Sequence, residues 1–208
     1  IYEHLYEKTI GDAYDKIEVL YLLKQIFENT KNSDGKLAGD GTGLETSRKQ
    51  NNEANKKTRE YMTIIVDSRE IVQAFDISGT QECQIMHELI TQVTGDSLRL
   101  DAGFNDRELV KKIVDLKMTP YVFPKKNNIL NGDSTWKNMY LSLLFDVMKW
   151  LTEYHQRSHS ESFHSSFKQV FGIVTKRRPT CIISQITARI ILHNRKRLSY
   201  FSKLANAS

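Results

Sequence analysis

The sequence has few of the residues that cross-link or stiffen small secreted proteins. Of its 208 residues only two are cysteine, Cys83 and Cys181, and only three are proline. Two cysteines do not make a disulfide framework, so we expect the protein to work in a reducing compartment. A chain of this length buries roughly 70% of its unfolded surface on folding and needs no such cross-links.

Long hydrophobic runs are also missing. No segment approaches the roughly 18 apolar residues of a membrane-spanning helix, and the polar start at Ile1-Tyr2-Glu3-His4 does not resemble a signal peptide. No P-loop motif is present, so we expect no nucleotide cofactor. Because the first residue is isoleucine and not methionine, we expect a fragment of a longer protein.

Charge is unevenly distributed along the chain. The net charge is +5, yet residues 154–208 hold ten Lys and Arg and a single acid, Glu161, while residues 1–153 are net negative. Such an asymmetry indicates a surface for a polyanion, with nucleic acid first and an anionic membrane second. A solvated basic helix face would give the same charge count.

Hydrophobic periodicity and turn residues predict an α/β protein, in which helices flank a mixed sheet. The polar segment 45–60 shows no periodicity and is expected to be a loop. Strands are expected over 37–43, 61–66, 71–77, 97–100 and 118–123, the second and third as a hairpin. Helices are expected over 12–29, 81–93, 105–117, 136–171 and 182–200. The fourth is expected to be one long helix, because it contains no Pro or Gly.

Two of the predicted strands end in an aspartate followed by small residues. The segments are Asp40-Gly41-Thr42-Gly43 and Asp101-Ala102-Gly103. Ligands of open α/β sheets bind at strand ends, and glycine allows a close approach to the backbone. Asp also favours turns for local reasons, so each motif alone is a weak signal. Together with Glu161 on a later helix, the two aspartates could form a set of oxygen ligands for Mg²⁺.

The predicted long helix also carries a polar stripe. Four residues fall within about 60° of one another at 100° per residue: Tyr154, Arg157, Glu161 and Lys168. The opposite side is expected to pack inward and holds Phe163, Phe167 and Val170. An exposed stripe of salt bridges with no function would show the same spacing, and each pair would contribute under about 1 kcal/mol to stability. The two strand-end aspartates favour a functional site over that reading.

These residues together resemble the DDE transposases of prokaryotic insertion sequences. The resemblance rests on the order Asp40, Asp101, Glu161 and on the signature Tyr-x2-Arg-x3-Glu-x6-Lys, which begins at Tyr154. Segments 39–43, 101–104 and 167–172 also look like the family, as does His193-Asn194 in the last predicted helix. The resemblance runs from about residue 12 to about residue 201.

The resemblance implies a ribonuclease H-like fold in a compact version, because residues 124–134 are too few for the large β-rich insertion of some relatives. It implies an enzyme that cleaves transposon ends and joins them to target DNA. Asp40, Asp101 and Glu161 would hold two Mg²⁺ ions, which Mn²⁺ can replace. Arg157 and Lys168 would contact phosphate, and Tyr154 would contact DNA near the cut.

The remaining expectations concern the wider protein. The basic cluster Lys176-Arg177-Arg178 suits contacts with the phosphate backbone. The family implies terminal inverted repeats and target DNA as partners, a homodimer on DNA, no membrane association, and a place in the prokaryotic cytoplasm at the nucleoid. Residues 1–35 are expected to be a helical lead-in remaining from an upstream region, and residues 36–208 the catalytic domain with basic C-terminal helices.

Three alternatives stay open. Residues 1–39 show no helix-turn-helix, so the chain could be a truncated, inactive remnant that binds DNA without cutting it. A different ribonuclease H-like nuclease, such as a junction resolvase, would share the carboxylates without needing the helical signature. A helical interaction protein with no site would leave the acids and the stripe as coincidence.

Histidines and tryptophans give weaker signals. His155 and His159 have an i, i+4 spacing that suits zinc, but no Cys or further acid completes a tetrahedral set, so these two and His164 are expected to face solvent or DNA. His87-Glu88 lacks the second histidine of a zincin helix. Trp136 and Trp150 are expected in the core.

Overall fold

The computed structural model describes residues 16–44, 60–78, 82–129, 131–176 and 178–206. The predicted loop at 45–60 lies almost wholly outside these residues. The chain forms two compact units, which we name the sheet unit (Asn32–Thr42 and Tyr61–Ser166) and the helical unit (Ile1–Lys31, Gly43–Glu60 and Phe167–Ser208). The predicted boundary between residues 35 and 36 stays a prediction. No helix in the described ranges is both long and apolar enough to cross a membrane.

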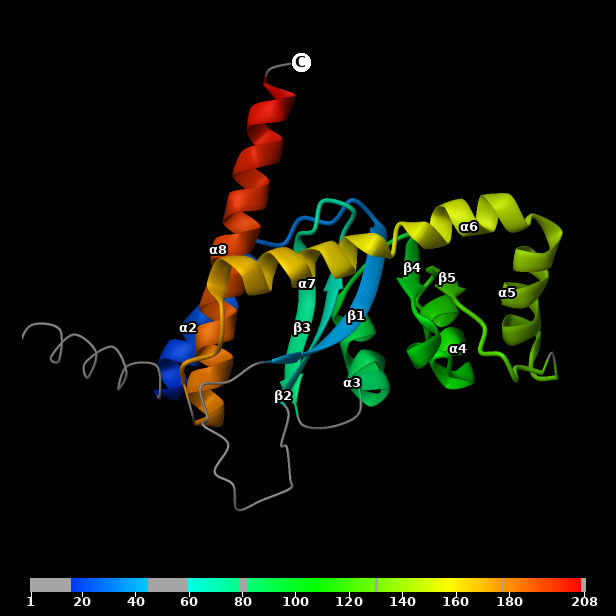
Figure 1. Ribbon diagram of the computed structural model, residues 1–208, viewed down its shortest axis with the longest axis horizontal. Coiled ribbons are helices and arrows are strands. Elements are labelled where there is room, and N and C mark those ends of the chain that lie inside the picture. The colour runs from blue at the N-terminus through cyan, green and yellow to red at the C-terminus, as the bar shows by residue number, and fades with distance from the viewer. Residues whose placement is uncertain (1–15, 45–59, 79–81, 130, 177, 207–208) are drawn as a thin grey trace, which may run out of the picture. The chain divides into compact units, whose positions relative to one another are not determined.

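A five-stranded mixed sheet has the order β3-β2-β1-β4-β5 (Figure 1). β2 and β3 form the predicted antiparallel hairpin, while β1 pairs with β4, and β4 with β5, in parallel. The α/β fold predicted from the sequence is therefore confirmed. The strands are β1 (Lys36–Leu44), β2 (Glu60–Val66), β3 (Val72–Ser78), β4 (Ser97–Leu100) and β5 (Thr119–Val122).

The hairpin turn is held by one buried aspartate. The carboxylate of Asp67 accepts hydrogen bonds from the backbone N–H groups of Arg69 and Ile71, each at 2.9 Å. It also pairs with the Arg69 guanidinium at 2.7 Å. Because Asp67 is fully buried, these bonds satisfy a charge that would otherwise be costly to remove from water. They fix the register of the two strands.

The core of the sheet unit forms between the strands and the helices that follow them. Helix α3 (Glu82–Leu89) continues into a 3₁₀ turn, η1 (Ile90–Gln92), and α4 (Arg107–Asp115) follows a second turn, η2 (Ala102–Phe104). Between β5 and the helix that begins at Ser134, described residues 123–129 and 131–133 form no strand, as the compact version of the fold predicts. The buried cluster includes Leu37, Leu98, Leu100, Met86, Leu89, Ile113, Trp136 and Tyr140.

Aspartate side chains cap the first turns of two helices of the sheet unit. Asp106 accepts from the Leu109 N–H at 2.8 Å and begins α4. Asp133 accepts from the Trp136 N–H at 2.8 Å and begins α5 (Ser134–Phe145). Each bond satisfies one of the N–H groups that the first turn of a helix leaves unpaired.

The prediction of one long helix over 136–171 is wrong. Three helices occupy this segment: α5, α6 (Val147–His155) and α7 (Ser158–Phe171). Asp146 has φ −144° and ψ 84°, ends α5, and caps α6 through the Lys149 N–H. An aspartate side chain that bonds to nearby N–H groups competes with the helix, so α6 leaves α5 at a steep angle (Figure 1).

The predicted inner face of this segment is partly correct. Trp136, Trp150, Phe163 and Phe167 are buried, as expected. Val170 was expected beside the two phenylalanines but is 59% exposed. All three residues lie in α7, and Val170 lies in its last turn, so the buried face of this helix ends at Phe167.

In the helical unit α2 (Ile17–Glu28) packs against α8 (Pro179–Ala205). α8 begins with proline, whose missing N–H costs nothing in the first turn. The Asn194 amide donates to the Thr30 hydroxyl at 3.1 Å, and both side chains are fully buried. Asn194, in a segment that looked like the transposase family, therefore joins α8 to the end of α2.

Candidate active site

The two predicted aspartates lie on neighbouring strands. Ala38 of β1 is paired with Arg99 of β4 in the parallel register, and Asp40 and Asp101 each come two residues later. The register therefore places the two aspartates side by side. The prediction that both end their strands holds only for Asp101, which directly follows β4, because β1 continues past Asp40 to Leu44. Asp101 also begins η2, where it accepts from the Gly103 N–H at 2.7 Å, and this bond fixes the orientation of its carboxylate.

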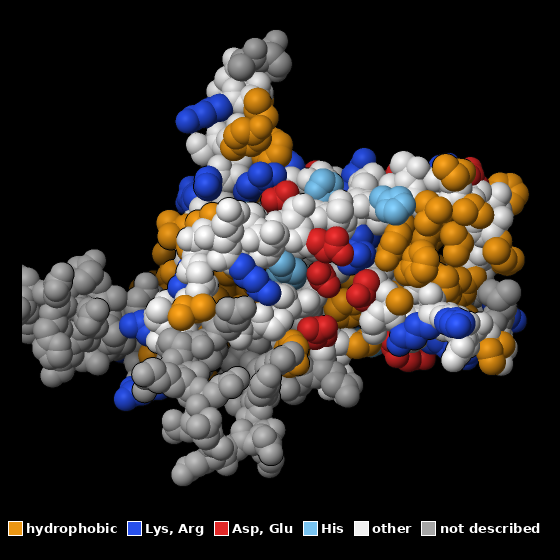
Figure 2. Space-filling view, viewed as in Figure 1, with side chains coloured by type: hydrophobic (Ala, Val, Ile, Leu, Met, Phe, Trp, Pro, Cys, Tyr) orange, Lys and Arg blue, Asp and Glu red, His pale blue; other side chains and the backbone are white. Residues whose placement is uncertain are grey.

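Glu161 lies in the first turn of α7, and the part of α7 up to Ser166 belongs to the sheet unit. Its carboxylate accepts a hydrogen bond from Arg157 at 2.5 Å. Burial opposes the charge of Arg157, but Tyr154, Glu161 and Asp40 together raise its pKa. Arg157 therefore keeps a positive charge among the acidic groups, which gather on one face in Figure 2.

Burial and the neighbouring acids both disfavour the charge of Asp40. Its side chain is only 18% exposed, and burial together with the charges of Asp101 and Glu161 raises its pKa from 3.8 to about 6, although the Gly41 N–H and Arg157 oppose the shift. Carboxylates that repel one another in a half-buried site are suited to a hard divalent cation. Within the described ranges these three acids do not all come within 4.8 Å of one another, so the set is more open than a closed metal cage.

Glu82 is a fourth acid in this site, and the sequence reasoning missed it. A Cβ atom on Gly41 would lie 2.4 Å from the carboxyl carbon of Glu82. Glycine at position 41 therefore leaves the space that the Glu82 carboxylate occupies. Burial and the charge of Asp101 raise the pKa of Glu82. In the sequence Glu82 is recognisable only as an acid in the first turn of a helix. Acids are common there because they interact favourably with the helix dipole, so the position does not indicate a site.

His164 contradicts the expectation that it faces solvent or DNA. It is 6% exposed, and its Nε2 atom lies 3.8 Å from Oδ2 of Asp40. It follows Glu161 by three residues and is therefore on the same side of α7. The spacing of three residues from Glu161 could have placed His164 in the site. The prediction instead followed the basic composition of the segment. His155, in contrast, is exposed as expected.

Tyr154 is held in an aromatic cluster at the end of α6. Its ring stacks on Trp150 with centroids 5.2 Å apart and contacts Phe123 at 5.1 Å. The Arg157 guanidinium lies 5.9 Å from the ring of Tyr154. Tyr154 thus belongs to α6 and Glu161 to α7, and the helix is interrupted between His155 and Ser158. Tyr154 is half-buried, so part of its ring is accessible.

Arg99 is a second residue that sequence reasoning missed. It is 1% exposed, in the middle of β4. Its guanidinium donates to the Glu153 carboxylate at 2.6 Å, to the Glu153 carbonyl at 2.8 Å and to Ser97 at 2.9 Å. Arg99 therefore ties the strand that leads into Asp101 to the helix that bears Tyr154.

The other predicted cations belong to the helical unit. Lys168 is exposed and lines a hollow together with Arg189. Lys176 and Arg178 precede α8, and Arg177 lies outside the described residues. The structure thus brings Asp40, Asp101, Glu161, Arg157 and Tyr154 into one unit. It does not test whether the four cations of the helical unit contact DNA.

The raised pKa of Asp40 predicts a pH-dependent stability difference. The Asp40 carboxyl binds its proton more tightly in the folded than in the unfolded state. This proton stabilises the folded state fully below pH 3.8, and the contribution is lost as the pH rises through about 6. This pKa difference corresponds to about 3 kcal/mol. In EDTA we therefore expect Asp40→Asn to be more stable than the wild type at pH 8 but not at pH 4.

Urea denaturation at both pH values measures this difference. Asp96→Asn is the matched control, since Asp96 is an exposed aspartate in the turn before β4. Equal stability of Asp40→Asn and the wild type at pH 8 would contradict the interpretation of Asp40 as a repelled carboxylate.

A mixed sheet with one acid on β1, one directly after β4 and one on a later helix defines a ribonuclease H-like α/β protein. The family described as "Transposase DDE domain" matches residues 31–193. The chain therefore belongs to that family of DNA transposases, as the resemblance predicted, and DNA is its substrate. The match includes all four acids of the site. No curated protein and no solved structure matches the chain.

Proposed function

We propose that this chain is the catalytic domain of an insertion-sequence transposase, which cleaves transposon ends and joins them to target DNA. The observation that carries the proposal is the placement of Asp40, Asp101 and Glu161 in one unit. There they are close enough for Asp101 and Glu161 to raise the pKa of Asp40. Their oxygen donors fit two divalent cations, Mg²⁺ or Mn²⁺.

Asp40, Asp101 and Glu161 would hold these cations, with Glu82 beside them. When bound, the cations activate the attacking oxygen and stabilise the leaving oxygen of an in-line displacement. The chain's own residues hold the acids in place: the β1–β4 register sets Asp40 beside Asp101, and Arg157 orients Glu161. Arg157 would also contact a phosphate of the DNA, because its planar guanidinium offers more than one donor.

The remaining cations would contact DNA outside the acidic site. Lys168, Lys176, Arg177 and Arg178 would bind backbone phosphates, and this binding would weaken with salt. Tyr154 would contact DNA beside the cut through the accessible part of its ring. A homodimer on DNA, recognition of terminal repeats, and a place in the cytoplasm at the nucleoid stay predictions from the family.

A nicking and strand-transfer assay on supercoiled plasmid DNA tests the proposal. We expect nicked plasmid and joined products with Mg²⁺ or Mn²⁺, and none in EDTA. DNA binding that is sensitive to salt, without cutting in either metal, would instead support the inactive remnant. Cutting that persists in EDTA would exclude a metal-dependent site.

A further inference from the structure

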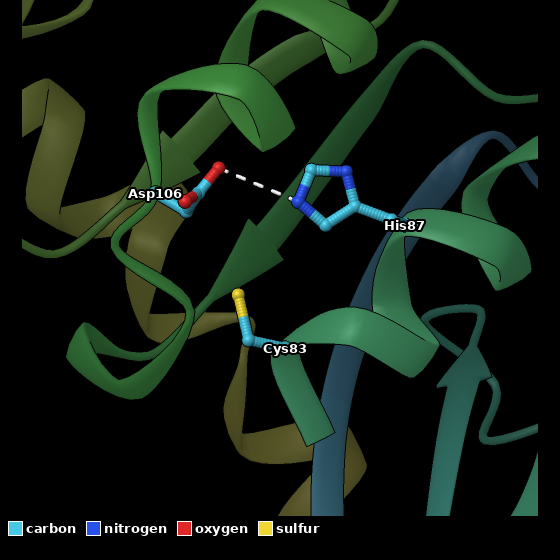
Figure 3. A group of neighbouring side chains, drawn as sticks. All are labelled: Cys83, His87 and Asp106. Carbon is cyan, nitrogen blue, oxygen red and sulfur yellow. Dashed lines mark ion pairs between the residues drawn. The ribbon is translucent and has the colours of Figure 1, made fainter. Parts of the chain in front are cut away.

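A second group of metal-binding side chains lies on the other side of α3. Cys83, His87 and Asp106 each offer one donor atom, and these atoms all lie within 4.8 Å of one another. In the described part of the chain this is the one group of three or more such side chains at that spacing. Figure 3 shows the three side chains pointing toward a common space between α3 and the start of α4.

Local structure holds these donors in place. Cys83 and His87 are separated by one turn of α3 and lie on the same face of that helix. Asp106 is fixed as the N-cap of α4, and its Oδ1 atom lies 3.4 Å from Nε2 of His87. The Lys112 ammonium of α4 donates to the His87 carbonyl at 2.5 Å, which ties the two helices together.

The donor chemistry selects the metal. Sulfur, imidazole nitrogen and carboxylate oxygen are the three kinds of ligand that Zn²⁺ accepts, whereas Mg²⁺ prefers oxygen alone. All three side chains are partly exposed, so an ion can reach them. The Oδ1 atom of Asp106 both accepts the N-cap hydrogen bond and faces Nε2 of His87, and a carboxylate oxygen has lone pairs for more than one partner.

We propose that Cys83, His87 and Asp106 form a Zn²⁺ site with water as the fourth ligand. The site is separate from the acidic one, because Glu82 lies against Gly41 while Cys83 lies near Asp106. Its role is structural. Asp106 follows Asp101 by five residues, so an ion bound to Asp106, Cys83 and His87 holds the segment after Asp101 against α3. The proposal does not depend on the DNA-cutting function.

Co²⁺ in place of Zn²⁺ makes the site visible. In the full chain, freed of metal by chelation, we expect one equivalent of Co²⁺ to give a thiolate-to-cobalt charge-transfer band and the visible bands of tetrahedral cobalt. Added Zn²⁺ should remove both. A cobalt ion held only by carboxylates gives no thiolate band, so the signal separates this site from the acidic one.

Matched variants assign the ligands. Cys83→Ser should lose the thiolate band, while Cys181→Ser, which changes a buried cysteine of α8, should retain it. Asp106→Asn keeps a capping side chain and should weaken Zn²⁺ binding by more than about tenfold, since even outer-shell changes cost that much. Zn²⁺ should raise the melting temperature of the wild type but not of Cys83→Ser. A wild type without the band, or a band that persists in Cys83→Ser, would overturn the proposal.

Discussion

Replacing Glu161 with glutamine is expected to abolish DNA cleavage and strand transfer. The amide keeps the size of the side chain but removes a negative charge from the acidic site. A neutral amide is a much weaker ligand for a divalent cation, and we expect the rate to fall by at least about a thousand-fold. Because Glu161 is 55% exposed, the substitution should leave the free energy of unfolding nearly unchanged.

The measurement is the plasmid assay with Mg²⁺ or Mn²⁺, together with DNA binding and circular dichroism. Glu88→Gln is the matched control, because Glu88 is an exposed carboxylate on α3. We expect full activity in Glu88→Gln and unchanged DNA binding in Glu161→Gln. Wild-type cleavage by Glu161→Gln would remove Glu161 from the catalytic set.

Replacing Arg99 with methionine is expected to give the largest loss of stability. Methionine fills much of the same volume but leaves the Glu153 carboxylate without its partner inside the unit. Breaking a buried ion pair on one side costs about 3–5 kcal/mol, and we expect the lower end because Glu153 is 32% exposed. The change should also weaken the link between β4 and α6.

A double-variant cycle separates the ion pair from packing. Urea denaturation of Arg99→Met, Glu153→Leu and the double variant should show that the second change recovers part of the loss, because no uncompensated charge remains. Arg107→Met is the control: this guanidinium is exposed and lies 5.5 Å from the ring of Trp136, so we expect less than about 1 kcal/mol. Purely additive losses would mean that packing, and not charge, holds Arg99.

The sequence predicted the sheet and the main acids because both depend on local patterns. β-branched runs located the hairpin, and the aspartates that follow strand residues located the site. The break at Asp146 was missed because the expected helix was judged by its lack of Pro and Gly. Asp146 ends α5 by a different route: its carboxylate accepts a hydrogen bond from the Lys149 N–H in the first turn of α6.

The residues that were missed depend on contacts between distant parts of the chain. Arg99 meets Glu153 across 54 positions, and no spacing in the sequence relates them. Glu82 enters the site only because Gly41 has no side chain, which requires the position of α3 beside β1. His164 was judged by its basic surroundings, although its partner Asp40 lies far away in the sequence.

The central place of β1 has a consequence for how the protein acquires activity. β2 and β3 are neighbours in sequence, and the β4–α4–β5 segment is continuous, so each can form from local contacts. β1 lies between these two parts of the sheet, and its pairing with β4 joins residues far apart in the chain, a kind of contact that slows folding. Without that pairing Asp101 has no Asp40 beside it. The acidic site that we propose for DNA cleavage is therefore complete only in a chain in which β1 has joined the sheet.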